Sequence, residues 1–410
     1  MTKRPPAGSP GLLRRLNSAA VLRAIRADGP VSRAEISRTT GLSKPTVNLA
    51  VELLLEQGYL DEGAELAAPG RPGRRPRLLR FASGIGHVLG IDIGANKVLV
   101  LAADLAGEVL AVERRQTGAR RGDPEALLAL VDDAVSHTLD AAGVPRESLK
   151  AVGVGTPGIV DPVSGRITLA PQLTGWEGIE LAKRLEPAFS CPVLVDNEVR
   201  LSLLAERWRG AAQTVDDAFL VQIGFGIGGG VLFGGEVYRG AGGAAGEIGY
   251  LPLFDDEEPR NGLGPFEHAA GGSAFARIAR HAAASEPTAL LELAGGDPGA
   301  IDAETVFAAA AAGDRVASRV LDDLLDRLAR GIAAAIVVLN PSIVIVGGGI
   351  SRAGERLRGP LERRIQALVP VPPRVILSQL GDEAVALGGV RLALQQVEQT
   401  LFDFAALELV

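Results

Sequence analysis

Cysteine is almost absent from this sequence, since Cys191 is the only one among 410 residues. A single thiol excludes an internal disulfide, and it excludes a cysteine-based zinc finger or ribbon within one chain. Histidine is also scarce, and the four positions lack the close spacing of metal ligands: His87, His137, His268 and His281. We therefore predict no metal site and assign no functional role to any histidine.

Long apolar runs are missing as well. No stretch of about 18 consecutive apolar residues occurs, which argues against a transmembrane helix. Residues 1–10 lack the apolar core of a signal peptide, so the sequence predicts a cytoplasmic protein without a membrane partner. Hydrophobic residues nevertheless make up 47% of the chain, and 410 residues are enough for two or three domains with their own cores.

Negative charge is scarce only in the N-terminal segment. Residues 1–80 contain 14 Lys and Arg against 7 Asp and Glu, whereas residues 81–410 contain 28 against 42. Such asymmetry is typical of a nucleic-acid-binding segment attached to a domain that does not bind nucleic acid.

The basic segment begins with two predicted helices. Apolar residues have helical spacing over 12–28, and Gly29 and Pro30 end this helix. Ser32 and Glu35 have the spacing of a capping box, in which each side chain bonds the backbone amide of the other residue. A second, short helix is therefore predicted to begin after Ser32.

A third helix and a basic loop complete the pattern. Gly41 ends the second helix, and Ser43 is the predicted N-cap of a third helix that extends towards Gly58. Strand-like segments at 59–60 and 77–81 enclose an arginine-rich loop. Two helices joined by a tight glycine turn and followed by such a loop predict a helix-turn-helix with a wing.

The start of the third helix and the wing supply the candidate DNA contacts. In a helix-turn-helix, the N-terminal end of the third helix enters the major groove, and wing arginines contact phosphates or the minor groove. Asn48 has the donor and the acceptor for a bidentate contact with adenine. The predicted DNA-binding residues are Ser43, Lys44, Thr46, Asn48, Arg71, Arg74 and Arg75.

Three runs in this segment, 29–35, 41–47 and 70–76, resemble the DNA-binding domain of ROK-family repressors. The resemblance supports a winged helix-turn-helix domain over residues 1–82. Because such domains act in pairs on two-fold symmetric sites, we expect an inverted-repeat operator on double-stranded DNA. The protein that binds it is expected to be a homodimer or a dimer of dimers.

The rest of the chain alternates apolar strand-like runs with helical stretches at 124–142 and 314–339, which predicts an α/β architecture. It also contains an internal echo. Glycine-flanked hairpins suggest a duplicated unit, in which 90–94, 97–100 and 107–109 match 220–224, 230–233 and 235–237. Glycines at such turns let backbone amides approach and face a phosphate.

The order of motifs in residues 86–396 is similar to that of ROK-family sugar kinases and their regulator relatives. The matching segments are 90–94, 155–158, 226–230, 246–249 and 344–349. The resemblance implies a two-lobed, actin-like domain over 86–396 that binds a sugar, followed by a C-terminal tail over 397–410. The fold prediction is therefore an α/β protein with an N-terminal winged helix-turn-helix and an actin-like domain.

The resemblance also indicates that the kinase chemistry is lost. The family's catalytic aspartate is matched by Glu198, whose longer side chain displaces the carboxylate, and a shift of about 1 Å at a reacting centre can cost roughly 100-fold in rate. Both phosphate-facing threonines are replaced, one by Asn96 and the other by Phe225. We predict a pseudo-kinase with no catalytic residue and no cofactor.

The zinc site usual in the family is also absent from the sequence. Tyr250 stands where the family has a histidine ligand. Glu258, Arg260 and Pro265 align with three cysteine ligands, and arginine and proline are not zinc ligands.

The sugar-contacting groups are better retained. By resemblance, the predicted sugar contacts are Asn197, Glu198, Glu247 and Glu267. Two departures, Gln172 for an asparagine and Tyr250 for a sugar-contacting histidine, predict an altered specificity. Carboxylates recognise hydroxyl groups directionally and repel phosphate, so the expected effector is a small neutral sugar.

The leading hypothesis is a transcriptional repressor of carbohydrate metabolism whose actin-like domain senses a sugar. Two alternatives remain open. The protein is an active ATP-dependent sugar kinase with an added DNA-binding domain, or the large domain is a ligand-free dimerisation scaffold.

Overall fold

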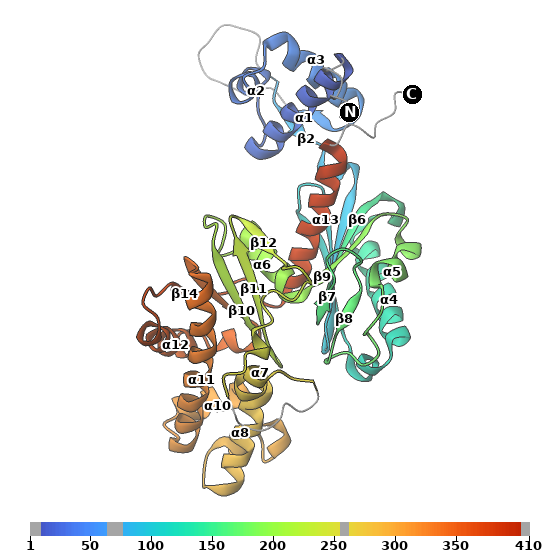
Figure 1. Cartoon of the computed structure of the whole chain (residues 1–410). Helices are drawn as coiled ribbons and strands as arrows, with labels where there is room; N and C mark the ends of the chain where they lie inside the picture. Colours follow the sequence, from blue (N-terminus) through green and yellow to red (C-terminus); the bar gives the residue numbers. More distant parts are fainter. Residues whose placement is uncertain (1–9, 64–76, 255–261, 403–410) are drawn as a thin grey trace, which may run out of the picture.

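The computed structural model describes residues 10–63, 77–254 and 262–402. A small N-terminal domain stands at one end of a larger domain, which is divided into two lobes (Figure 1). The predicted α/β class and the order of the two domains are confirmed. None of the helices in the described ranges combines the length and the apolar composition that a membrane span needs.

The N-terminal domain has three helices and a two-stranded antiparallel sheet. Its elements are α1 (Pro10–Asp28), α2 (Arg33–Thr40), α3 (Lys44–Glu56), β1 (Leu60–Glu62) and β2 (Leu79–Phe81). The capping box of Ser32 and Glu35 is confirmed, and Gly41 ends α2 in the left-handed conformation at φ +69°. Sequence reasoning was nearly correct at the third helix, which ends two residues before Gly58.

The core of this domain comes from one face of each helix. Val21, Leu22 and Ile25 of α1 pack against the buried residues of α3, which are Val47, Ala50, Val51 and Leu54, as the helical spacing predicted. The structure does not describe residues 64–76, so Arg71, Arg74 and Arg75 of the predicted wing lie outside the described residues.

Each lobe contains a five-stranded sheet, and the two sheets have the same topology. The first has the order β5-β4-β3-β6-β9, and the second has the order β12-β11-β10-β13-β14. In both, the first three strands are antiparallel and the last two are parallel to the central strand. The internal echo in the sequence therefore corresponds to a duplicated structural unit.

The first lobe consists of its sheet, the helices α4 and α5, and a small hairpin. The bounds are β3 (His87–Ile93), β4 (Lys97–Asp104), β5 (Val109–Gln116), α4 (Pro124–Ala142), β6 (Leu149–Thr156), β7 (Ile159–Val160), β8 (Ile167–Leu169), α5 (Leu181–Phe189) and β9 (Val193–Asn197). Helices α4 and α5 cover one face of the sheet through a core that includes the fully buried Trp176.

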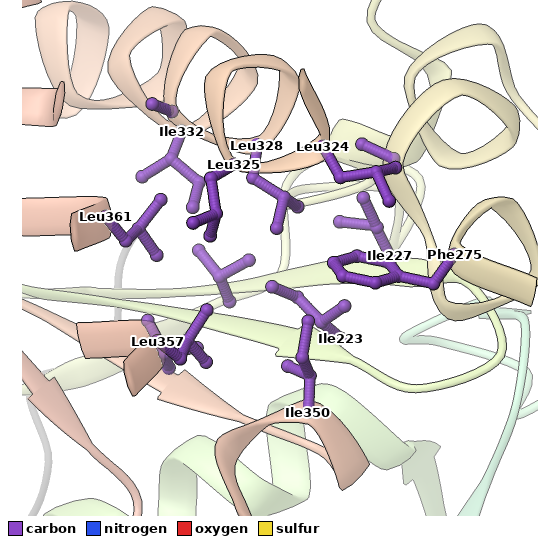
Figure 2. Packing of buried hydrophobic residues seen from close by; sticks show 14 of the residues in the cluster. Ile223, Ile227, Phe275, Leu324, Leu325, Leu328, Ile332, Ile350, Leu357 and Leu361 are labelled. Carbon is purple, nitrogen blue, oxygen red and sulfur yellow. The ribbon is translucent and has the colours of Figure 1, made fainter. Parts of the chain in front are cut away.

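The second lobe carries the larger set of helices. Its strands are β10 (Ala218–Ile223), β11 (Ile227–Phe233), β12 (Glu236–Tyr238), β13 (Ile343–Gly347) and β14 (Arg374–Leu377). Its helices are α7 (Pro265–Ala270), α8 (Gly272–Ser285), α9 (Leu290–Leu293), α10 (Ala303–Ala311), α11 (Arg315–Leu339) and α12 (Glu355–Leu368). Figure 2 shows Leu324, Leu325 and Leu328 of α11 packed over Ile223 and Ile227 of the sheet.

Two helices, α6 (Glu198–Arg209) and α13 (Ala384–Phe402), join the parts of the molecule. Helix α6 packs against α13 on one side and against β11 of the second lobe on the other. Helix α13 lies so close to the first sheet that a Cβ added to Gly90 would be 1.9 Å from the Ala386 carbonyl oxygen. Glycine is therefore required at position 90 for this contact.

Helix α13 extends from the lobes to the N-terminal domain (Figure 1). It continues past residue 396 to Phe402, and Val397 is buried. The first residues of the segment predicted as a C-terminal tail, 397–402, therefore belong to this helix, because its apolar face packs on the first lobe.

Candidate DNA interface and ligand cleft

Four predicted DNA contacts lie at the start of α3, and they differ in whether their side chains already have hydrogen-bond partners. Lys44 and Asn48 are exposed, while the Ser43 hydroxyl accepts a hydrogen bond from the Thr46 amide at 3.3 Å and lies 2.8 Å from the Thr46 hydroxyl. Ser43 and Thr46 thus satisfy each other as the cap of the helix. Of the four, Lys44 and Asn48 are therefore the exposed side chains that take no part in this cap.

All four predicted sugar contacts line one cleft between the two lobes. Asn197, Glu198, Glu247 and Glu267 share it with Gln172, Phe225 and Tyr250. The empty space inside the cleft is about 680 Å³, a figure that includes solvent at its open mouth. The structure therefore brings together residues that lie far apart in the sequence, such as Gln172 and Glu267, which are 95 positions apart.

Two of these four residues are already engaged by the backbone. The Asn197 side-chain oxygen accepts from the amides of Val199 and Arg200 as the N-cap of α6, and its side-chain amide donates to the Gly158 carbonyl at 2.8 Å. The Glu267 carboxylate accepts from the amides of Ile227 and Gly264 at 3.1 and 3.3 Å. Both side chains mainly hold the walls of the cleft in place.

Glu198 and Glu247 are different, because neither carboxyl has a hydrogen-bond partner among the described residues. Burial, reinforced by the charge of Asp92, raises the pKa of Glu198 to about 8. Burial also raises the pKa of Glu247, and the positive charge of Arg200 opposes that rise. A partly buried carboxyl without a protein partner is costly unless solvent or a ligand supplies one, so these two groups are the candidates for contacting a ligand in the cleft.

The raised pKa of Glu198 predicts a pH-dependent stability. Because the folded-state pKa of about 8 exceeds the usual 4.5, the contribution of Glu198 is fully present below about pH 4.5 and is lost as the pH rises through 8. We therefore compare the melting temperature of Glu198→Gln with that of wild type at each pH. The value for the variant minus the value for wild type is expected to be larger at pH 9 than at pH 5. The control Glu304→Gln, at an exposed position of α10, should show no such change. An equal difference at both pH values for Glu198→Gln would contradict the prediction.

The positions that match the kinase phosphate loops lie at the turns after β3 and β10. Asn96 is exposed, and Phe225 is 59% exposed and lines the cleft. Lys97 pairs with the buried Asp92 at 3.2 Å and donates to the Asp382 carbonyl oxygen at 2.5 Å. The ammonium group of Lys97, which follows this loop, is thus already paired.

Two arginines are paired with the same residue that Lys97 contacts, Asp382. Arg114 of β5 and Arg352, which follows β13, both bind the Asp382 carboxylate, at 2.9 and 3.0 Å. Burial disfavours the ionised Asp382, but the hydrogen bond from Arg114 and the charges of Lys97 and Arg352 hold its pKa below the usual value. Asp382 therefore forms charge-assisted hydrogen bonds with arginines from both lobes.

The region that corresponds to the family's zinc site is described only in part. Tyr250 donates its hydroxyl to the Gly262 carbonyl at 3.0 Å, and Pro265 begins α7. Glu258 and Arg260 lie outside the described residues. Within 10–63, 77–254 and 262–402, no three His, Cys, Asp or Glu side chains are grouped so that they could hold a metal ion.

Sequence reasoning missed the charged groups behind the cleft. Asp196 and Arg200 form a buried ion pair, and Asp382 links residues more than 260 positions away in the sequence. Asp196 and Arg200 are only four residues apart, but Asp196 lies in β9, so the spacing rule for pairs on one helix did not indicate the first pair. No local pattern indicated the second.

Fold and site together define a two-lobed, actin-like protein of the sugar-kinase kind that carries a winged helix-turn-helix domain. The chain belongs to the ROK family, whose sequence profile matches residues 88–396, and the profile of the MarR family matches residues 11–71. A solved structure described as a ROK family transcriptional regulator, homologous to the Escherichia coli MLC protein, superposes with a TM-score of 0.77 at 24% identity. The superposition covers 96% of this chain and 98% of the chain in the solved structure.

Two curated relatives differ in how much of the chain they match. The xylose repressor of Caldicellulosiruptor bescii is 28% identical over 396 residues, covering 95% of this chain and 98% of the relative. A glucokinase of Halalkalibacterium halodurans is 31% identical over 318 residues, covering 75% of this chain and 95% of the relative. The similarity to the kinase therefore leaves a quarter of this chain unmatched.

Proposed function

We propose that the protein is a DNA-binding transcriptional repressor of carbohydrate metabolism that is regulated by a small neutral sugar bound between its lobes. The observation that carries this proposal is the combination, in one chain, of an exposed recognition helix and a polar cleft with two unpartnered carboxyls. In sequence, the xylose repressor of C. bescii matches 95% of this chain, which includes both the DNA-binding domain and the cleft, whereas the glucokinase match spans three quarters of this chain.

The DNA ligand is an inverted-repeat operator bound by two copies of the chain. Two-fold symmetry of the protein requires two half-sites whose centres are about 10–10.5 base pairs, or a multiple of this distance, apart. Lys44 and Asn48 at the exposed end of α3 supply the major-groove contacts, and Arg71, Arg74 and Arg75 supply phosphate or minor-groove contacts.

The effector is a neutral sugar, because the cleft offers Glu198 and Glu247 as unpartnered groups together with Gln172 and Tyr250. A carboxyl with a pKa of about 8 is mostly protonated at neutral pH and is able both to donate to and to accept from hydroxyl groups. A phosphorylated sugar would lie beside the carboxyl groups of Glu247 and Glu267, and any ionised carboxylate there repels a phosphate.

The protein does not transfer phosphate. Glu198 replaces the kinase base and Phe225 replaces a phosphate-facing threonine. In addition, Asp382 binds Arg114 and Arg352, so these cations are not free for a nucleotide phosphate. Phosphoryl transfer depends on cations that neutralise developing charge, and the ion pairs with Asp382 make these two arginines less available for that role.

The route from cleft to DNA runs along α13. This helix contacts α6, which begins at Glu198, so closely that a Cβ added to Gly388 would be 1.9 Å from the Leu201 carbonyl oxygen. At its other end, Glu398 binds Arg26 of α1 at 2.7 Å and Arg391 at 2.6 Å. A ligand that changes the position of α6 is therefore coupled to the DNA-binding domain through packed elements.

Glu398→Gln is expected to weaken this coupling without changing the sugar site. A partly exposed ion pair contributes about 0.2–1 kcal/mol, so the sugar-induced change in operator affinity should fall by a factor of up to about five. Calorimetry should give an unchanged sugar affinity, and Glu304→Gln serves as the distant control. A full sugar effect in Glu398→Gln would exclude this contact as part of the route.

The function is tested by a sugar panel on the protein–operator complex. Xylose, glucose and other neutral mono- and disaccharides are added to the complex, and operator affinity is measured together with ATP-dependent sugar phosphorylation. We expect one sugar class to change operator affinity about 5- to 150-fold, and no turnover. Turnover of about 1–10³ s⁻¹ would instead show that the protein is a sugar kinase. If no sugar in the panel binds, the remaining hypothesis is that the large domain is a ligand-free dimerisation scaffold.

A further inference from the structure

A buried ion pair lies directly behind the cleft, where β9 ends and α6 begins. Arg200 is 2% exposed and Asp196 is 4% exposed. The Nε atom of Arg200 donates to Oδ1 of Asp196 at 2.5 Å, while Oδ2 accepts from Nε of Arg239 at 2.9 Å. Arg239 follows β12 of the second lobe, so one carboxylate of the first lobe binds the guanidinium groups of α6 and of the second lobe.

The remaining donors of Arg200 hold a loop. Its two terminal nitrogens donate to the carbonyl oxygens of Gly243 at 2.5 Å and Val160 at 3.3 Å. Gly243 belongs to the loop 239–247, and Val160 belongs to β7 of the first lobe. Gly243 has a φ of +73°, and a Cβ added there would be 2.1 Å from the Val160 carbonyl oxygen. Arg200 thus clamps the loop on the first lobe at a point where only glycine leaves enough space.

The clamped loop ends at Glu247, one of the two unpartnered carboxyls of the cleft. Its last turn is fixed by a second close contact, since the Gly229 amide donates to the Gly246 carbonyl at 2.8 Å. Arg200 itself does not line the cleft, although its neighbours Glu198 and Val199 do. Its position lets it act on a ligand through the loop and not by direct contact.

We propose that Arg200 is the positioning residue of the ligand cleft: by clamping loop 239–247 on the first lobe, it sets the place of Glu247 relative to Glu198. This inference rests on the proposed sugar-binding function. A buried, fully paired charge also contributes to folding, and the loss of one partner is costly. The test must therefore separate positioning from stability.

The experiment uses the full-length protein and the sugar that binds best in the panel. Arg200→Lys retains a positive charge beside Asp196 but lacks the fork that reaches Gly243 and Val160. We expect calorimetry to give a sugar affinity at least about 10-fold lower than that of wild type. Amide hydrogen exchange in residues 239–247 should be faster even without sugar.

A double-mutant cycle with Glu247→Gln identifies the mode of action. If Arg200 acts through Glu247, Arg200→Lys should cause little further loss of affinity in the Glu247→Gln background. A residue that only stabilises the fold would give additive losses. Arg207→Lys is the matched control, because Arg207 of the same helix also donates to three carbonyls and pairs with Asp216. It should bind sugar like wild type.

Gly243→Ala provides a second variant if Arg200→Lys does not fold, because it displaces the loop from Val160 without changing a buried charge. It should lower sugar affinity by a similar factor. Three results would overturn the inference: an unchanged sugar affinity in the variants, additive losses of affinity in the double-mutant cycle, or an unchanged rate of amide exchange in 239–247. As long as wild type binds the sugar, these results leave the proposed function intact. If wild type binds no sugar, the proposed function fails and the inference fails with it.

Discussion

Asn48→Ala is expected to bind the operator about 5- to 150-fold more weakly than wild type and to lose base preference at one position of each half-site. A bidentate amide–adenine contact is worth about 1–3 kcal/mol of discrimination. Asn48 is exposed, and the neighbouring Val47, Ala50 and Val51 anchor α3 in the core. The substitution should therefore leave the fold unchanged, and fluorescence anisotropy with systematically varied operators measures its effect.

Lys44→Ala is the matched control for this experiment. Lys44 is an exposed point charge in the first turn of the same helix, so its loss should weaken binding to all sequences alike. The slope of log affinity against log salt concentration should fall by about one. If Asn48→Ala also weakens all sequences to the same extent, Asn48 does not contact a base and the proposed docking of α3 is wrong.

Glu247→Gln is expected to lower sugar affinity by about 10- to 150-fold, since a hydrogen bond to a charged group is worth about 1.5–3 kcal/mol. The amide has nearly the same shape as the carboxylate, so steric effects are small. Isothermal titration calorimetry measures the loss directly. Glu177→Gln is the control, because Glu177 is exposed and close enough to influence Tyr250 electrostatically without lining the cleft.

The same variant links the cleft to DNA binding. Coupling between two binding sites is reciprocal, so the sugar concentration needed to change operator affinity should rise by the factor lost in calorimetry. A ligand with equal affinity for both states of the protein shifts neither. If Glu247→Gln lowers sugar affinity but leaves the operator response at its original concentration, the sugar that binds in the cleft is not the effector.

The DNA-binding domain was largely predictable because its signals are local. Ser32 with Glu35, and Ser43 with Thr46, are only three residues apart, and their hydrogen bonds form as soon as the helix starts. The duplication of the large domain was also visible, since the same glycine hairpin occurs twice. The segment around Asn197 and Glu198 was assigned to the cleft by resemblance, and the structure places both residues there.

Tertiary structure alone decided how the cleft residues are used. Glu267 has the same residue type as the unpartnered Glu198 and Glu247, but its carboxylate accepts from the amide of Ile227, 40 positions earlier. The side-chain amide of Asn197 likewise donates to the Gly158 carbonyl, 39 positions earlier. Similarly, Asp382 binds Arg114, 268 positions earlier. Local order follows from backbone geometry over a few residues, which the sequence by itself determines here. Whether a carboxyl is satisfied or free depends on which distant segments fold against it, and that is determined only when the two lobes pack.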